Sequence, residues 1–230
     1  MTHSKTFPLA PLTPELRRPR DAQARRLRRH RRTRRRITSY ASFIAIVTVL
    51  ALPIGQFAVR TVFIPSESMA DTLAVGDLVI VNRLPSYATE LKRGDIVVFS
   101  DRNDWLGTAD GGETHLVKRV IGLPGDHVSY TVGGEHLLVN GEPIDEAYIA
   151  GGSLPSRTAF DVVVPECSLW VLGDNRDNSA DSRAYVDGPG SGFVPMSDVL
   201  GTAVAMVWPV PRFGLLHDYR DAFADVPDAR

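Results

Sequence analysis

Four segments of the sequence gather polar residues between apolar ones, and two of them contain groups that could carry out nucleophilic chemistry. One is residues 64–73, IPSESMADTL, which place two serines two positions apart. The other is residues 115–126, HLVKRVIGLPGD, in which Lys118 stands between apolar neighbours. If the face of this predicted strand that carries Lys118 is buried, loss of hydration lowers the lysine pKa from about 10.4 toward neutrality. A neutral amine of that kind can act as a general base.

Both segments also have a purely structural interpretation. Residues 64–73 could be a serine-rich linker, because they follow shortly after an apolar stretch. On a strand, Lys118 shares one face with Leu116 and Val120, and a lysine in such a position commonly marks a solvated sheet edge. Residues 93–99, RGDIVVF, are interpreted as a turn that leads into a core strand. The residue types alone therefore leave Lys118 either as a buried base or as an edge residue.

The last polar segment is residues 173–183, GDNRDNSADSR, which follow directly on an apolar stretch. Alternating Asp and Arg residues are typical of a polar surface loop, and also of a loop braced by ion pairs between carboxylates and guanidinium groups. A calcium loop of the EF-hand type is excluded, because Arg176 stands where a bound cation would be repelled and no Glu closes the loop. The sequence predicts no metal ion and no cofactor.

Composition limits the class of protein further. With 230 residues and 43% hydrophobic content, the chain is long enough for one domain of about 150–200 residues plus a tail, and too apolar to be disordered throughout. The single cysteine, Cys167, excludes an intramolecular disulfide, a cysteine-rich zinc site and a CxxC redox pair. The formal net charge of −1 is the sum of a basic segment and an acidic remainder of the chain. Residues 1–36 hold 13 of the 26 basic residues but only two acids.

An uncharged segment of 23 residues, 37–59, follows this arginine-rich tail. Because about 20 helical residues cross a hydrocarbon layer of about 30 Å, we predict a retained transmembrane anchor. A cleavable export signal is the competing interpretation, but the apolar run exceeds the usual length of about 7–15 residues and no small-x-small site ends it. The positive-inside rule places residues 1–36 in the cytoplasm and residues 60–230 outside. The arginines are assigned to topology and anionic lipid, so no nucleic-acid partner is predicted.

The elements that must position the polar segments are short β-type runs separated by turns. Gly133-Gly134 and Asn140-Gly141 are predicted hairpin turns. The sequence thus predicts an all-β, antiparallel domain at 60–230, with a small β excursion at about 127–167. Residues 203–209 are predicted to form a core strand, or an edge that rests on a membrane with Trp208 at the interface. The predicted strands are residues 77–81, 96–99, 114–121, 127–132, 135–139, 161–164 and 168–172.

In this order, the four segments resemble those of the bacterial type I signal peptidases, or leader peptidases, which are membrane serine proteases with a Ser/Lys dyad. Residues 118–126, KRVIGLPGD, and residues 173–183 follow the pattern of that family residue for residue, as do residues 93–99. Residues 68–73 differ at one place, because the family usually has Pro where this chain has Asp71. The resemblance covers the chain from about Ile64 onward. It implies an antiparallel β-sheet catalytic domain of the signal-peptidase type with a single N-terminal transmembrane helix.

The resemblance also implies a role for each matching residue. Ser68 is the nucleophile and Lys118 its general base. Ser66 forms the oxyanion hole together with the backbone N–H of Ser68, and Ser179 orients the Lys118 amine. Three residues support the site structurally: Gly173, Asp181 and Arg183. The residues that flank the dyad and line the substrate pocket are Ile64, Pro65, Met69, Leu73 and Val117.

These roles imply an endopeptidase of the bacterial cell membrane that removes N-terminal signal peptides from exported preproteins. It cuts after small residues through an acyl-enzyme intermediate, and its partners are preprotein signal peptides, the lipid bilayer and the protein secretion machinery.

Three alternatives stay open. A Ser-His-Asp hydrolase would use His115, which strand alternation places on the face away from Lys118. A sortase-like cysteine transpeptidase would use Cys167, which is interpreted as a small apolar filler. A catalytically inactive, anchored binding or scaffold domain is favoured only by Asp71.

Overall fold

The structure is a computed structural model of the chain, and it describes residues 40, 42–43, 59–83, 90–102, 104–106, 114–149 and 151–229. The chain divides into two compact units, Met1–Ile54 and Gly55–Arg230. In the first unit, residues 40, 42 and 43 are helical, whereas the predicted tail at 1–36 and most of the predicted anchor at 37–59 lie outside the described residues. A search of the described residues for a helix of sufficient length and apolar character to cross a membrane finds none.

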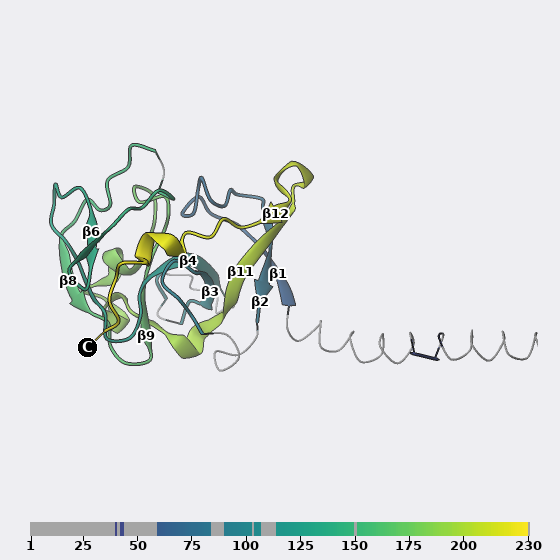
Figure 1. Ribbon diagram of the computed structural model, residues 1–230, viewed down its shortest axis with the longest axis horizontal. Coiled ribbons are helices and arrows are strands. Elements are labelled where there is room, and N and C mark those ends of the chain that lie inside the picture. Colours follow the sequence, from purple (N-terminus) through teal and green to yellow (C-terminus); the bar gives the residue numbers. More distant parts are fainter. Residues whose placement is uncertain are drawn as a thin grey trace, which may run out of the picture. The chain divides into compact units, whose positions relative to one another are not determined.

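The second unit is built on an eight-stranded sheet in which each pair of neighbouring strands is antiparallel (Figure 1). Its strand order is β1-β2-β11-β3-β4-β9-β10, and the short β12 pairs with β11. The strands are β1 (Val59–Phe63), β2 (Leu78–Asn82), β3 (Ile96–Ser100), β4 (His115–Gly122), β9 (Ser168–Leu172), β10 (Val194–Pro195), β11 (Val199–Trp208) and β12 (Gly214–Leu215).

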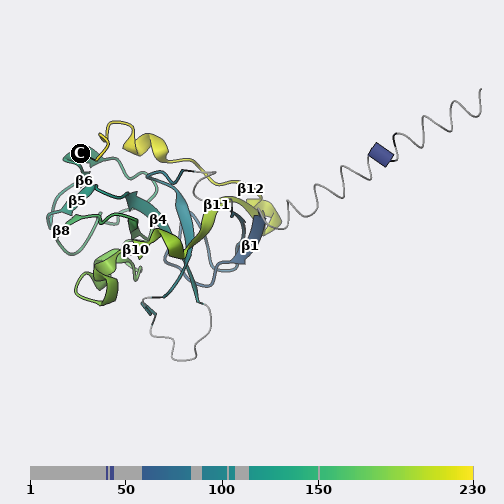
Figure 2. The ribbon, with the colours of Figure 1, turned by 90° about the horizontal axis from the view of Figure 1, so that it is seen from below.

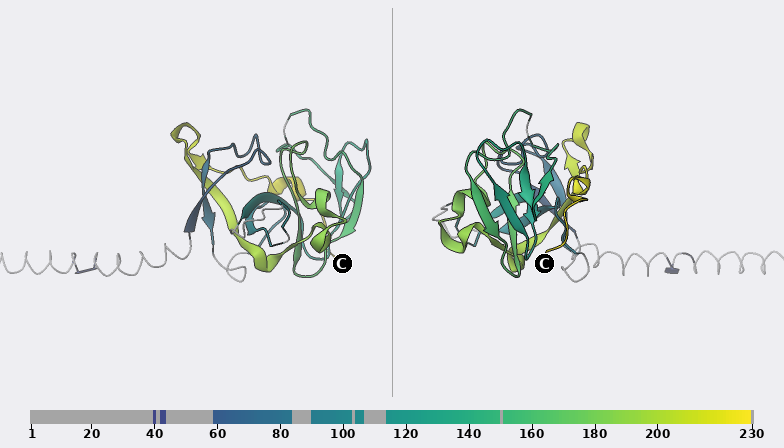
Figure 3. Two further views of the ribbon diagram at one scale, coloured as in Figure 1. Left: turned by 180° about the vertical axis from the view of Figure 1, so that it is seen from behind. Right: turned by 60° about the vertical axis from the view of Figure 1, so that its left-hand side comes forward.

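A smaller antiparallel sheet is inserted in the chain between β4 and β9, with the order β7-β6-β5-β8 (Figure 3). It contains β5 (His127–Tyr130), β6 (Leu137–Val139), β7 (Glu142–Ile144) and β8 (Phe160–Val163). Asn140 and Gly141, between β6 and β7, have φ angles of 52° and 89°. Two positive φ angles are what a tight two-residue hairpin turn requires, so the predicted turn is confirmed.

The remaining regular structure of 59–229 consists of short 3-10 helices. The C-terminal segment, yellow in Figure 2, runs from β12 past the large sheet to the small one, where Phe223 and Val226 are buried in the same cluster as Trp170. The prediction of an all-β antiparallel domain is therefore confirmed for the described residues of this unit. The 3-10 helices are η2 (Ser182–Tyr185), η3 (Pro189–Gly192), η4 (Met196–Asp198), η5 (Val210–Arg212) and η6 (Arg220–Phe223).

The place of β4 decides between the two interpretations of Lys118. This strand lies between β3 and β9, where Lys118 pairs with Val97 of β3, and only 2% of its surface is exposed. The edge interpretation is therefore wrong, because a strand with neighbours on both sides has no open edge for a lysine to protect. Leu116 and Val120, on the same side of the strand as Lys118, pack in one apolar cluster with Val97. Apolar packing on this face removes the lysine from water.

Candidate active site

Ser68 lies in the loop that joins β1 to β2. The backbone N–H of Ile64 donates to the carbonyl of Asp77 at 2.9 Å, which extends the hairpin beyond the strands. The N–H of Leu73 donates to the carbonyl of Met69 at 2.7 Å and closes a turn directly after Ser68. Ile64, Met69 and Leu73 are buried in one apolar cluster. Three apolar anchors around a closed turn thus fix the position of the serine.

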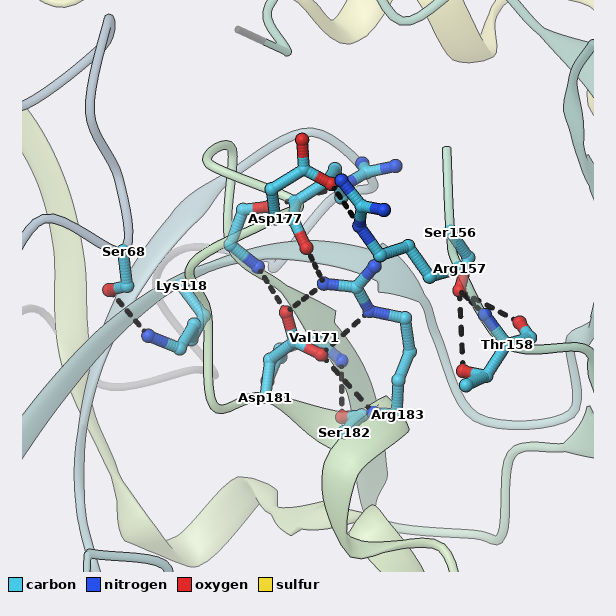
Figure 4. A network of polar contacts seen from close by, with 12 residues as sticks. Ser68, Lys118, Ser156, Arg157, Thr158, Val171, Asp177, Asp181, Ser182 and Arg183 are labelled. Carbon is cyan, nitrogen blue, oxygen red and sulfur yellow. Dashed lines mark hydrogen bonds and ion pairs between the residues drawn. The ribbon is translucent and has the colours of Figure 1, made fainter. Parts of the chain in front are cut away.

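The side chains of Ser68 and Lys118 are in direct contact (Figure 4). The Lys118 Nζ donates a hydrogen bond of 2.6 Å to the Ser68 Oγ, although 50 residues separate the two in the chain. The Ser66 hydroxyl lies 3.2 Å from the Ser68 hydroxyl on the exposed side of the pair. A buried amine within hydrogen-bond reach of a serine hydroxyl is the geometry that removal of the hydroxyl proton needs.

Burial sets the protonation of this amine. Desolvation lowers the pKa of Lys118 from 10.5 to about 8, although the charges of Asp181 and Asp174 act to raise it. The charge of Arg183 lowers the pKa further. Each of the two acids is paired with its own arginine, Asp181 with Arg183 at 2.7 Å and Asp174 with Arg119 at 2.6 Å. Loss of hydration therefore outweighs the attraction of the nearby carboxylates.

Residues 173–183 form a loop that packs against the Ser68 turn. A Cβ atom at Gly173 would lie 2.2 Å from the Ser179 Oγ and 2.4 Å from the backbone oxygen of Ser68, so only glycine fits this approach. The Gly173 N–H donates to Asp181 at 2.9 Å. The guanidinium of Arg183 forms two hydrogen bonds with the same carboxylate (Figure 4). Burial acts to raise the pKa of Asp181, but the hydrogen bonds and the charge of Arg183 hold it below its usual value.

Ser179 lies beside the pair but does not contact Lys118 through a hydrogen bond. Its hydroxyl oxygen is buried and makes no hydrogen bond with a described residue, although it is near enough to Asp181 to lower the pKa of that carboxyl. The orienting contact between Ser179 and Lys118 is thus not formed in this structure, and its role stays a prediction.

Further hydrogen bonds tie the loop to the Ser68 turn through residues that sequence reasoning did not find. The Thr72 hydroxyl donates to Asp174 at 2.6 Å, and the Asn175 N–H donates to the Ser68 carbonyl at 3.1 Å. Asp174 also accepts two hydrogen bonds from Arg119, next to Lys118 on β4. Thr72 and Asp174 are 102 positions apart, so no local spacing signals their contact.

A cleft of about 270 Å³ opens beside the Ser68–Lys118 pair. Of the predicted pocket residues, Ile64, Pro65, Met69 and Val117 line it. Leu73 does not, because the turn directs it into the core, where it is fully buried. The additional apolar lining residues are Leu106, Leu116 and Ala180.

The residues of the two rival enzymes lie differently from expectation. His115 lines the same cleft as Lys118, whereas strand alternation had placed it on the opposite face. Its Nδ1 is buried and forms no hydrogen bond with a described residue, so no Ser-His-Asp arrangement is assembled among these residues.

Cys167 is exposed and has a φ angle of 59°, in the turn before β9. The interpretation of Cys167 as a small apolar filler was therefore wrong, and Cys167 does not line the cleft. No cluster of three or more potential metal-ligating side chains occurs among the described residues.

Asp71 has a left-handed backbone conformation, with a φ angle of 78°. Proline is restricted to φ near −65°, whereas glycine adopts positive φ readily. Replacing Asp71 with Pro is expected to lower the free energy of unfolding by more than about 1 kcal/mol and to disturb the Ser68 turn. Asp71→Gly, the matched control, is expected to keep both stability and activity. Thermal unfolding of the two variants checks this, and an Asp71→Pro protein as stable as Asp71→Gly would contradict the assigned backbone conformation.

The site contains the parts of a serine hydrolase that uses an amine as its base. Comparison with known proteins agrees with this class, because the family described as "Signal peptidase, peptidase S26" matches residues 37–208. The chain belongs to this family and is a serine peptidase.

Several relatives are similar over most of their length. A signal peptidase I from Leptolyngbya laminosa is 40% identical over 75% of this chain and 80% of the relative. Signal peptidase I S from Bacillus subtilis (strain 168) is 35% identical over 74% of this chain and 88% of the relative. A solved structure of a signal peptidase I from Enterococcus faecalis V583 is 29% identical, with a TM-score of 0.37, and covers 50% of this chain and 97% of that one.

Proposed function

We propose that this chain removes N-terminal signal peptides from exported preproteins with a Ser68–Lys118 dyad. The observation that carries the proposal is the 2.6 Å contact between the Ser68 hydroxyl and an amine that is almost fully buried. Membership in the signal peptidase family supports the substrate, and the contact supports the chemistry.

The proposed reaction has two steps. Neutral Lys118 takes the proton of Ser68 as the Oγ attacks the scissile carbonyl carbon, and the resulting ammonium then gives that proton to the leaving amine. The C–N bond breaks, the mature protein leaves, and the signal peptide stays as an ester on Ser68. In the second step, Lys118 takes a proton from water as the water oxygen attacks the ester carbon. The bond between this carbon and the Ser68 Oγ breaks, the Lys118 ammonium returns the proton to Ser68, and the signal peptide leaves with a free carboxyl group.

Ser66 is proposed to stabilise the oxyanion that forms on the carbonyl, together with the Ser68 N–H. Its hydroxyl lies 3.2 Å from the attacking oxygen and is exposed to the cleft. Loss of one such donor lowers turnover by about 10²–10³-fold. Ser66→Ala is expected to lower kcat by this amount while KM stays nearly constant, because the donor acts on the transition state. A Ser66→Thr variant, which keeps a hydroxyl, serves as the control. An equal loss of kcat in both variants would argue against the assigned donor.

The cleft supports a preference for small side chains at the first and third positions before the cut. Its volume of about 270 Å³ is below the range of about 300–1,000 Å³ that drug-sized ligands occupy. Branched or long side chains of Ile64, Met69 and Val117 fill its walls. We propose that these buried side chains limit the room beside the dyad to small substrate side chains at those two positions.

The chain is further proposed to be a single-pass protein of the bacterial cell membrane. In this proposal residues 1–36 are cytoplasmic, residues 37–59 span the bilayer, and residues 60–230 form the catalytic domain outside, where the secretion machinery delivers its substrates. A group of exposed apolar side chains supports contact of this domain with lipid. They lie on β1, β11, η5, β12 and the turn between η5 and β12: Phe63, Trp208, Val210, Phe213 and Leu215. Patches of this kind mark interaction surfaces.

Incubation of the full chain in detergent micelles with a preprotein tests the proposed function. We expect one cut after a small residue, identified from the mass of the released protein, and no cut when that residue is replaced by Trp. His115→Ala and Cys167→Ala should both keep kcat within about twofold, because neither residue belongs to the dyad; since His115 lines the cleft, its replacement is expected to act on KM. Absence of cleavage would instead support an inactive scaffold domain, and loss of cleavage in either variant would support the corresponding rival enzyme.

A further inference from the structure

The small inserted sheet reaches the loop at 173–183 through two buried side chains that follow β7. Glu146 has 8% of its surface exposed and Tyr148 has 3%. The Tyr148 hydroxyl donates to the Glu146 carboxylate at 2.8 Å. A buried carboxylate is retained only where it is paired, and the proposed reaction itself uses neither residue.

Glu146 holds the middle of the loop through Arg176. The guanidinium of Arg176 donates to both carboxylate oxygens, at 2.8 and 2.5 Å, and the two side chains are 1% and 3% exposed. From its Nε, the same guanidinium donates to the Gly173 carbonyl at 3.0 Å. Gly173 is the residue whose backbone lies against the Ser68 carbonyl. Glu146 therefore fixes, through Arg176, a point at which the loop packs against the Ser68 backbone.

Tyr148 is connected to the Ser68 turn by a second series of contacts, which ends at Thr72. The guanidinium carbon of Arg119 lies 4.2 Å from the centre of the Tyr148 ring, within the range of a cation–π contact. Arg119 donates two hydrogen bonds to Asp174, at 2.8 and 2.6 Å. Asp174 in turn accepts the hydroxyl of Thr72, four residues after Ser68 in the same turn.

We propose that Glu146 and Tyr148 are positioning residues through which the inserted sheet aligns Ser68 with Lys118. Two chains of contacts lead from this pair to the surroundings of the nucleophile, one through Arg176 to the Gly173 backbone and one through Arg119 and Asp174 to the Thr72 hydroxyl. The inference rests on the proposed function, since it assigns a role to the insertion in that same site. This role also assigns a function to the inserted sheet, although the sheet lies far from Ser68 in the sequence.

If the loop at 173–183 becomes looser, water gains access to the Lys118 amine. The charged groups that act on this amine are Asp181, Asp174 and Arg183, and Arg119 neutralises Asp174. If the loop moves away, water hydrates the ammonium form and its pKa rises toward 10.5. A smaller fraction of Lys118 is then neutral at a given pH, and the two reacting groups are less well aligned.

Arg157 supplies a matched control for Glu146, because it links the inserted segment to the same loop but is exposed. Arg157, also in the inserted segment, forms an ion pair of 2.8 Å with Asp177 of the same loop (Figure 4). Its side chain is 72% exposed and that of Asp177 is 37% exposed. Exposed ion pairs contribute little to structure. Arg157→Gln and Glu146→Gln thus each neutralise one link between the insertion and the loop, but only the second link is buried.

The test compares four variants of the full chain with a preprotein substrate over a range of pH. They are Glu146→Gln, Arg157→Gln, Tyr148→Leu and Ser68→Ala. Glu146→Gln and Tyr148→Leu are expected to lower kcat by about 10- to 100-fold. KM should stay within about twofold, and the pH midpoint of kcat should move up by about one unit. Arg157→Gln should match the unaltered chain in all three quantities. Thermal unfolding gives the folded fraction of each variant, by which kcat is corrected.

The inference is overturned if the folded Glu146→Gln protein has the kcat and the pH midpoint of Arg157→Gln, or if its loss of kcat equals its unfolded fraction. If Glu146→Gln does not fold, Tyr148→Leu decides by the same criteria. Failure of the proposed function is recognised separately, because Ser68→Ala would then cleave as well as the unaltered chain.

Discussion

Replacing Lys118 with Met is expected to lower kcat by about 10⁴-fold or more, since removal of the base from such a catalytic unit has effects of this size or larger. Met has a similar length and no proton-accepting atom. The Ser68 hydroxyl would keep its place in the turn, because that turn is held by backbone hydrogen bonds and by buried Met69 and Leu73. No other basic side chain forms a hydrogen bond with Ser68 among the described contacts.

The same substitution is expected to make the folded protein more stable near pH 7. The pKa of Lys118 is about 8 in the folded state, below the unfolded value of 10.5, so folding at pH 7 buries a charge that prefers water. Between these two values the unfolded chain binds more protons, and stability rises with pH across this window; below about 8 the penalty is constant. Removing the amine lifts this penalty, which amounts to about 3 kcal/mol at neutral pH.

Activity of the unaltered chain is expected to rise as pH increases through about 8, where Lys118 loses its proton. Initial rates of preprotein cleavage between pH 6 and pH 10, together with urea unfolding of both proteins, measure these effects. Lys92→Met is the control, because this lysine is exposed. A Lys118→Met protein that keeps a tenth of the activity, or a flat pH profile, would show that another group removes the proton.

Ser68→Ala is expected to abolish the acyl-enzyme and to lower kcat by about 10⁴-fold or more, leaving only what substrate positioning provides. Stability should change little, since the hydroxyl is the sole group removed and its neighbours Met69 and Ile64 keep their packing. Binding of the signal peptide should also persist, because the cleft walls are unchanged.

Mass spectrometry of the unaltered chain with a slow ester substrate should reveal one added acyl group on the peptide that contains Ser68. Ser68→Thr provides a control that keeps the hydroxyl but adds a methyl group in a buried turn. An acyl group on another residue, or normal cleavage by Ser68→Ala, would remove Ser68 from the reaction.

The sequence predicts those parts of the fold that depend on local pattern. Alternation of apolar residues, as in 127–132, marks strands because successive side chains face opposite sides of a sheet. Asn140-Gly141 marks a turn because both positions need positive φ. Contacts between distant residues carry no such signal, so the Thr72–Asp174 hydrogen bond and the Glu146–Arg176 ion pair emerge only from the folded chain.

Errors of the sequence analysis have equally physical causes. Leu73 was assigned to the pocket because it lies near Ser68 in the chain, but a hydrogen-bonded turn directs it into the core. Cys167 was interpreted as a small apolar filler from its residue type, yet it has a positive φ and lies in an exposed turn. The burial of Lys118 could not be decided from one strand alone, because it depends on which strands pair on either side.

The central claim is that the amine in contact with Ser68 is largely neutral at moderately alkaline pH. The chain has only three lysines, Lys5, Lys92 and Lys118, so a sample labelled at lysine gives a simple side-chain NMR spectrum in which Lys118→Met identifies the relevant signal. Titration of that signal in the full chain is expected to give a pKa of about 8 for Lys118. A Lys118 signal that titrates at the ordinary lysine value of 10.5 would contradict the account.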